Sequence, residues 1–435
     1  MTDRRAMETL QSASKNGVPA ASSAVALGEG AALTGIRWFE VPLLFYFMVH
    51  FFPPMPSGIA NLCLALGAAG VLWECRAEHW RRLERLRHPL VLAWGILVAL
   101  LAISLRQVPE DLLRESWRYF SKDLLKHTLF ALVILLYLDT ANRARRVLLA
   151  GTLACALMLA FCLAEIVAMI WKTGRLKFQR DYLFYLMFFF PFLLVTYRFD
   201  SRWRFLCFAL ASATIALAFL MGFRGAVLAL LVMSLIFSVF ARIWGVLFFG
   251  AVFAAAGLAI FFYWFPEQAA YVLAKFQQTG SSGRVSGHWL PAWEMSMQAP
   301  WLGHGFGHHL FSYQFGLQMD QNAAWTRITT ELPRSQHSVV FETLFMAGWP
   351  ALLLLGTIVG TIIFSLGKMV WRRREAVFSS PWLSLALAVF IALIGNFLVF
   401  YQTEDPGWRT APIAVMLAVS CHLALRKVGD GSSGE

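Results

Sequence analysis

The chain has 435 residues, of which 59% are hydrophobic and 14% charged, and its mean hydropathy is +0.61. A soluble domain carries about a quarter charged residues, so an ordinary soluble domain is excluded. Repeated apolar stretches of roughly 18 or more residues predict an all-α polytopic membrane protein. The net charge of +12 would suggest a nucleic-acid partner in a soluble protein. In a membrane protein it predicts basic loops that orient the helices, and we expect no nucleic acid.

The chain begins with residues 1–34, which are rich in Ala, Ser and Gly and lack the compact apolar core of a signal peptide. This segment is predicted to be a disordered cytoplasmic tail, and residues 427–435 are predicted to be a flexible tail. Between them we expect twelve membrane spans, nine within 35–264 and three within 338–426, separated by one long loop at 265–337. Their approximate ranges are 36–53, 58–75, 88–105, 124–139, 147–170, 182–198, 204–222, 225–241, 244–264, 338–367 (long or broken), 380–401 and 410–425.

The distribution of basic residues predicts how these spans are oriented. An even number of spans places both termini on one side, and 22 of the 37 Lys and Arg residues fall on that side. The positive-inside rule identifies it as the cytoplasm. On the outer side, the short loop "WKTGRLKFQRD" (171–181) contains Lys177 and Arg180. A basic outer loop works against the rule, so it indicates either contact with lipid headgroups or an anion site outside the membrane.

The long outer loop, 265–337, is predicted to carry a site. Connections longer than about 12–15 residues are usually functional or disordered, and the four tryptophans of this one favour a folded cap on the membrane. Within it, "GRVSGHWLPAWEMSMQAPWLGHGFGHHL" (283–310) opens with Arg284 and ends in a glycine-rich turn. Its GxGxG follows no strand, which favours tight turning over nucleotide binding. Its histidines have no Cys or carboxylate beside them at ligand spacing, so no metal site is predicted.

Two polar groups stand where outer loops meet apolar runs. In "ELPRSQHSVVFETLFMAGWPALLLL" (331–355), His337 follows Arg334 by one turn and precedes Ser338, which is predicted to cap a helix. This histidine is either an interfacial group satisfied by water or an active-site base. Arg224 begins another predicted helix. It is either a snorkelling interfacial cation or a phosphate ligand that acts with the free N–H groups of its helix.

Three segments in this order carry a resemblance: "MGFRGAVLAL" (221–230), "GR…W…W…P.LG.G.G" (283–307), and His337 with Ser338, followed by Gly348 eleven residues after the histidine. The pattern resembles the O-antigen ligase and O-antigen polymerase superfamily of bacterial envelope enzymes, and within it most closely the lipopolysaccharide O-antigen ligases. Polymerases and protein O-oligosaccharyltransferases share the pattern, so both stay as alternatives.

The resemblance implies a GT-C-like glycosyltransferase of the bacterial inner membrane with a periplasmic site. It would transfer O-antigen glycan from undecaprenyl diphosphate to a sugar hydroxyl of lipid A–core, with no cofactor. Because the outer acidic pairs form no DxD, no metal is expected. The diphosphate is a good leaving group, so the reaction needs a base and cations that stabilise the developing charge. The expected base is His337, and the expected substrate-binding cations are Arg224, Arg284, Arg180, Lys177 and Arg334.

A secondary transporter is a further alternative, because twelve spans are common in that class. Transporters tend to show two related halves and charged or broken helices at mid-membrane. This chain shows no such repeat, and its ionisable residues collect at one face.

Overall fold

The structure, a computed structural model, describes residues 35–50, 56–173, 181–277, 285–322, 325, 338–402 and 408–430. Residues from Trp38 onward form one unit, whose fold is given below. The tail predicted at 1–34 lies outside the described residues.

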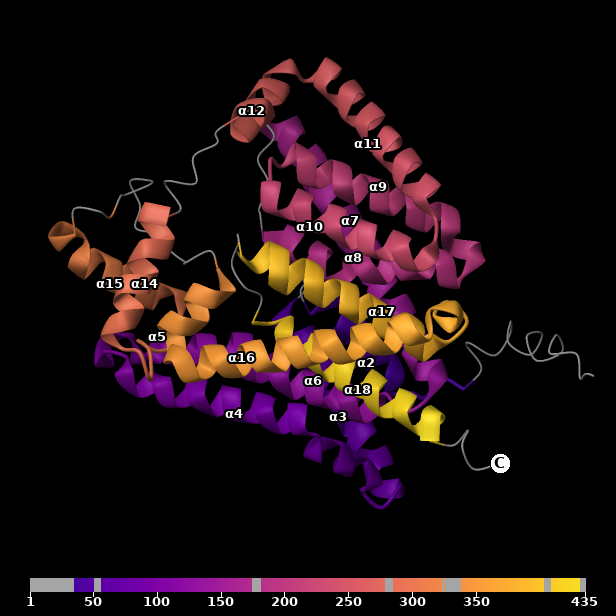
Figure 1. The fold of residues 1–435 in the computed structure, drawn as a ribbon, viewed down its shortest axis with the longest axis horizontal. Helices are drawn as coiled ribbons and strands as arrows, with labels where there is room; N and C mark the ends of the chain where they lie inside the picture. Colours follow the sequence, from indigo (N-terminus) through magenta and orange to yellow (C-terminus); the bar gives the residue numbers. More distant parts are fainter. Residues whose placement is uncertain are drawn as a thin grey trace, which may run out of the picture. The chain divides into compact units, whose positions relative to one another are not determined.

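Every regular element in the described residues is a helix (Figure 1), and each of the twelve predicted spans overlaps a helix. Apolar segments form helices in a membrane because every backbone N–H and C=O must find its partner within the segment. These helices are α2 (Glu40–Val49), α3 (Ser57–Ala77), α4 (Pro89–Ser104), α6 (Lys126–Tyr137), α7 (Ala141–Thr173), α8 (Asp181–Phe199), α9 (Arg204–Leu220), α10 (Arg224–Ala241), α11 (Trp244–Trp264), α16 (Val339–Arg372), α17 (Pro381–Leu393) with the π-helix η8 (Ile394–Val399), and α18 (Ala411–Asp430).

Length and composition make the chain a polytopic helical membrane protein. Seven helical segments of the described part are long and apolar enough to cross a membrane: α3, α4 with η2, α7, η4 with α9, α10, α16 and α17 with η8. Shorter apolar helices fall within α2, α8, α11 and α18. The number of twelve spans and the GT-C-like arrangement stay predictions. Helix α18 continues to Asp430 and so overlaps the first residues of the predicted flexible tail.

Shorter helices connect the long ones. The described part of the predicted cap is helical, as expected. We call α14 and α15 the cap. The cap end is the end of the bundle where the long helices lie nearest the cap. There α14 packs on α16. The connecting helices are η1 (Arg81–Arg87), η2 (Leu105–Gln107), α5 (Glu110–Tyr119), η3 (Phe120–Leu125), η4 (Ser201–Trp203), α12 (Pro266–Gln277), η5 (Val285–Trp289), α14 (Leu290–Gln298), α15 (His308–Gln318), η6 (Met319–Gln321), η7 (Arg374–Ala376) and η9 (Phe400–Gln402).

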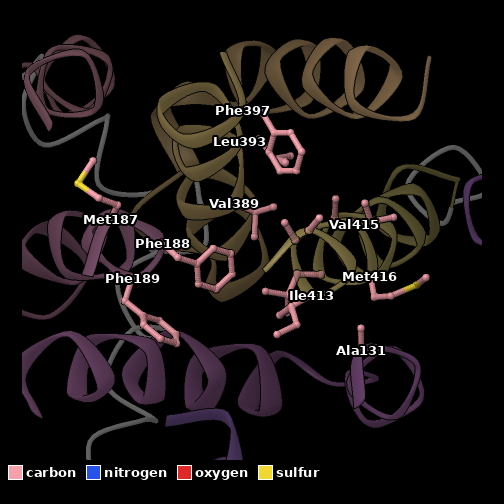
Figure 2. Close-up of a cluster of buried hydrophobic side chains, with 14 of the residues drawn as sticks. Ala131, Met187, Phe188, Phe189, Val389, Leu393, Phe397, Ile413, Val415 and Met416 are labelled. Atoms are coloured by element: carbon pink, nitrogen blue, oxygen red, sulfur yellow. The ribbon is translucent and has the colours of Figure 1, made fainter. Parts of the chain in front are cut away.

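The long helices pack through large apolar side chains set against small residues. Figure 2 shows Phe188 of α8, Val389 of α17 and Ile413 of α18 in one buried cluster. Gly151 of α7 lets Phe192 of α8 approach so closely that a Cβ at position 151 would lie 2.4 Å from its ring. Small residues at helix contacts are what membrane helices use, because apolar burial alone does not drive association in lipid.

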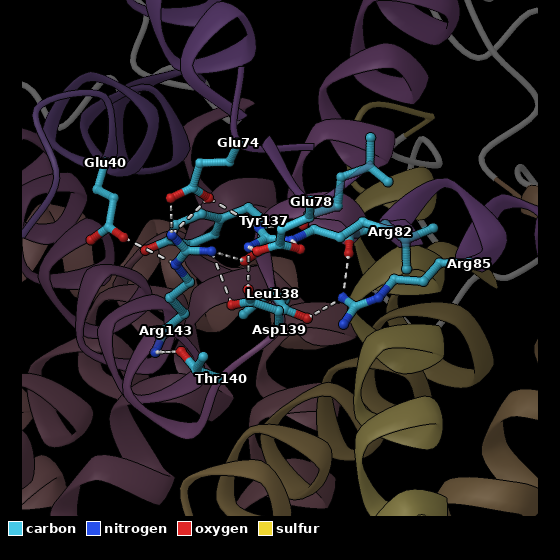
Figure 3. Close-up of polar contacts among 12 residues, drawn as sticks. Glu40, Glu74, Glu78, Arg82, Arg85, Tyr137, Leu138, Asp139, Thr140 and Arg143 are labelled. Carbon is cyan, nitrogen blue, oxygen red and sulfur yellow. Dashed lines mark hydrogen bonds and ion pairs between the residues drawn. The ribbon is translucent and has the colours of Figure 1, made fainter. Parts of the chain in front are cut away.

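At the end opposite the cap, buried charges join α2, α3, η1 and α7 (Figure 3). Arg143 lies 3.0 Å from Glu40 and 2.8 Å from Glu74. Arg82 lies 3.0 Å from the same Glu74 and 2.6 Å from Asp139. Buried ions are tolerated only with such partners, because each loses its hydration. The network has four acids and four arginines: Glu40, Glu74, Glu78, Asp139, Arg82, Arg85, Arg143 and Arg146.

Candidate functional site

Helix α16 is broken at Gly348, whose backbone has φ +74° and ψ −172°, a conformation that only glycine adopts readily. In an unbroken helix the Trp349 N–H would donate to the carbonyl of Phe345. Here it donates to the carbonyl of Pro300 at 2.8 Å. Pro350 has no N–H and therefore leaves the carbonyl of Met346 without its helical donor. Two carbonyls of α16 are thus open to outside partners.

The glycine-rich turn before α15 supplies those partners. The His304 N–H donates to the Phe345 carbonyl at 2.7 Å, and the Gly305 N–H donates to the Met346 carbonyl at 3.1 Å. A Cβ at Gly303 would lie 2.4 Å from the Phe345 carbonyl oxygen, and a Cβ at Gly348 would lie 2.4 Å from that of Pro300. The two glycine motifs are therefore two halves of one contact, which we call the cap joint.

Side chains fix the cap on both sides of the cap joint. The His304 ring stacks on Phe345 at 4.8 Å, and its Nε2 lies 2.8 Å from the Met295 carbonyl oxygen. Trp293 of α14 meets Trp349 edge-on, with ring centroids 6.1 Å apart. The cap is thus held on the segment of α16 that follows Ser338.

The first turn of α16 is buried among polar groups. Ser338 is the N-cap residue and is 2% exposed. Contrary to the prediction, its hydroxyl makes no capping hydrogen bond to the helix. Glu342, one turn later, is fully buried. Its Oε1 accepts a hydrogen bond from Trp408 Nε1 at 3.1 Å and lies 3.5 Å from His308 Nδ1.

Next to Trp408, Arg409 is held by two other elements. Its Nε donates to Asp123 Oδ1 at 2.9 Å, and a second guanidinium nitrogen lies 2.8 Å from the same oxygen. Its third nitrogen donates to the Tyr185 hydroxyl at 2.7 Å. Asp123 lies in η3 and Tyr185 in α8, so this cation is fixed by segments far apart in the chain.

The sequence analysis found none of Glu342, Trp408, Arg409 and Tyr185. Asp123 and Arg409 are separated by 286 positions, and no local spacing reveals such a contact. One signal was available: Arg409 directly precedes a predicted apolar span, as Arg224 does.

Of the predicted site residues, the structure describes Arg224. It begins α10, as predicted, and it is exposed. Gly222, two residues earlier, has φ +65°. Helices α10 and α16 both pack on η9, so η9 connects them. The other predicted site residues lie outside the described residues: His337, Arg284, Arg180, Lys177 and Arg334.

The loop histidines have separate partners. His304 faces Met295, His308 faces Glu342, and His309 Nε2 lies 3.1 Å from the Ser116 hydroxyl. Burial lowers the pKa of both His304 and His309, so these two rings are neutral at pH 7. Within the described ranges, no three His, Cys, Asp or Glu side chains gather as metal ligands.

Two comparisons with known proteins agree with this organisation. A family model described as O-antigen ligase matches residues 208–356, a segment that contains Arg224, His337 and the cap joint. The O-antigen ligase of Salmonella typhimurium is 28% identical over 319 residues, which cover 70% of this chain and 76% of that protein. The chain is therefore similar to O-antigen ligases, through the family model over residues 208–356 and through the Salmonella typhimurium protein over 70% of its length.

Proposed function

We propose that the protein is an O-antigen ligase, which transfers a glycan from undecaprenyl diphosphate to a sugar hydroxyl of lipid A–core. The observation that carries the proposal is the cap joint. It unites the two glycine motifs of the family pattern and fixes the cap on the first half of α16, whose N-cap Ser338 follows His337 in the sequence. A reaction between two membrane lipids needs such a site, because both reacting ends emerge where helices leave the membrane.

The proposed chemistry needs few groups. The acceptor hydroxyl must lose its proton as it attacks the anomeric carbon, and His337 is the proposed base because an imidazole titrates near neutral pH. The departing diphosphate carries the negative charge away. Arg224, exposed at the first turn of α10, is the proposed diphosphate ligand, together with the N–H groups that a helix leaves unpaired at its start. Arg284, Arg180, Lys177 and Arg334 are proposed to complete this charge.

No metal is required in this scheme. Arginine keeps its charge at any working pH and binds phosphate oxygens in pairs, so it can take over the role that a divalent cation has in other transferases. The lipid diphosphate is already a competent leaving group.

An apolar cavity supports a lipid-linked donor. It has a volume of about 420 Å³ and lies between α8, α9, α10 and α11, where its lining includes Phe219, Leu231, Phe237 and Ala254. Arg224 begins the same α10 that supplies Leu231 and Phe237. We propose that part of the polyprenyl chain lies in this cavity while its diphosphate meets Arg224. Helix α10 therefore offers apolar side chains to the lipid chain of the donor and a cation to its diphosphate.

The proposed site faces the periplasm. The arginines of the buried network belong to the basic loops predicted to be cytoplasmic. Helix α4 follows η1 of that network and ends at Ser104, beside Gly305 of the cap joint. An impermeant thiol reagent should therefore label a cysteine introduced in 283–310 from outside the inner membrane. Labelling only after that membrane is breached would overturn the orientation.

A deletion strain tests the function itself. Loss of a ligase leaves bare lipid A–core on a gel, while lipid-linked polymer accumulates. Core that carries a single repeat unit would instead assign the chain to the polymerases.

A further inference from the structure

Three cations gather at the cap end on the side of α5 and α6. Lys122 lies in η3, Lys126 is the first residue of α6, and Arg409 precedes α18. Lys122 and Lys126 are four positions apart in one helical run, so they share a face. Asp123, between them, binds Arg409. The charges of Lys122 and Arg409 both act on Lys126. We call these three cations the Arg409 cluster.

Among the described residues, the Arg409 cluster has more positive charge than its neighbours neutralise. Asp123 pairs with Arg409. Across the described part of the chain, no carboxylate forms a salt bridge with Lys122 or Lys126. The contact that Lys126 makes is with the Tyr46 ring, 5.7 Å from its Nζ. The network at the opposite end differs, because there each of Arg82, Arg143 and Arg146 binds a carboxylate. Excess cations beside an apolar medium are unfavourable unless an anion joins them.

Arg409 is arranged to receive such an anion. Three of its N–H groups bind Asp123 and Tyr185, which hold the guanidinium in one orientation. A guanidinium has five N–H donors, so two are left over among the described residues. The side chain is 38% exposed, so a ligand can reach it. A fixed planar donor with two free N–H groups suits the oxygens of a phosphate.

The neighbouring surface indicates that the phosphate belongs to a lipid. Leu125 and Leu129 lie on the same helical run as Lys122 and Lys126. They are 36% and 54% exposed, as expected of side chains that face lipid. Cations above exposed leucines match a molecule with an anionic head and an apolar tail.

We propose that the Arg409 cluster is a second phosphate site, separate from Arg224, which binds a phosphate group of one of the two lipid substrates. The inference rests on the proposed function for the identity of those lipids. Two sources fit: the diphosphate of the polyprenyl donor, and the phosphates carried by the lipid A portion of the acceptor. Both present the same phosphate oxygens at the membrane boundary.

The test measures binding, with no glycan transfer required. The full-length protein in nanodiscs is compared with Lys126→Gln and with a Lys122→Gln, Lys126→Gln double variant. The matched control is Arg106→Gln, which removes an exposed cation at the end of η2. The probes are undecaprenyl diphosphate, bisphosphorylated lipid A, dephosphorylated lipid A and phosphatidylglycerol.

The double variant should bind undecaprenyl diphosphate or bisphosphorylated lipid A about tenfold to a hundredfold more weakly. The lipid whose affinity falls identifies the source of the phosphate. Lys126→Arg should retain most of the affinity. Arg106→Gln and dephosphorylated lipid A should show no such effect. Unchanged affinity for both phosphorylated substrates, or a change confined to phosphatidylglycerol, would overturn the proposal. The assay measures lipid binding alone. If the parent protein fails to transfer glycan, the proposed function is rejected, but the binding data still decide whether the Arg409 cluster binds phosphate.

Discussion

Replacing Gly348 with alanine is expected to open the cap joint. Alanine at φ +74° and ψ −172° would be strained by about 1–3 kcal/mol, and its Cβ would lie 2.4 Å from the Pro300 carbonyl oxygen. Relief requires the joint to separate, which breaks the three hydrogen bonds donated by His304, Gly305 and Trp349. These bonds, at about 0.5–1.5 kcal/mol each, oppose the separation in the parent and the variant alike. The docking equilibrium should therefore shift by the added strain of about 1–3 kcal/mol, which corresponds to roughly 5- to 150-fold.

Hydrogen exchange followed by mass spectrometry measures this shift directly. Peptides that contain the amides of His304, Gly305 and Trp349 should be protected in the parent protein and exchange faster in Gly348→Ala. Gly356→Ala is the matched control, because it lies in the same helix and a Cβ there meets no atom within 4 Å. It should leave protection unchanged. Equal protection of the three amides in Gly348→Ala and the parent would refute the cap joint as described.

Three further changes test other parts of the protein. Ala254→Phe, which fills part of the apolar cavity, should weaken binding of undecaprenyl diphosphate and spare a short-chain diphosphate analogue; equal loss for both would remove the cavity from the donor site. His337→Ala should reduce turnover by roughly 10²-fold or more and leave donor affinity nearly intact. Arg224→Ala should instead weaken donor binding by about tenfold to a hundredfold. The reverse pattern would exchange the two proposed roles. Arg143→Met removes the cation that joins Glu40, Glu74 and Asp139 and should destabilise the fold by about 3–5 kcal/mol in thermal unfolding. This effect should be far larger than that of Arg145→Met, whose bond to Asp200 is 3.5 Å long and partly exposed. Equal midpoints for the two variants would show that the buried network adds no stability.

The sequence was most informative where the physical constraint is local. A membrane span needs a long apolar run, so the helices could be placed from hydropathy, and α10 begins at Arg224 as expected. The break in α16 was also foreseen as a possibility. Its cause lies at Gly348 and Pro350, both visible in the sequence.

The long-range contacts could not be predicted. Tight turning was the expected role of Gly303, but its actual constraint is the backbone of Phe345 some forty positions later. The bonds of Arg409 to Asp123 and Tyr185 join three segments whose proximity depends on the whole bundle. Helix α5 was missed because its pattern is amphipathic, with polar residues that interrupt the hydropathy on which the span prediction depended.

The central claim is that the protein joins O-antigen to lipid A–core. It is tested most directly with the purified protein, undecaprenyl-diphosphate-linked O-antigen and lipid A–core together in excess EDTA. The account predicts a ladder of glycan attached to lipid A–core and release of undecaprenyl diphosphate, both reduced by roughly 10²-fold or more in His337→Ala. Longer lipid-linked polymer with no attachment to core, or attachment that appears only when Mg²⁺ or Mn²⁺ is restored, would contradict it.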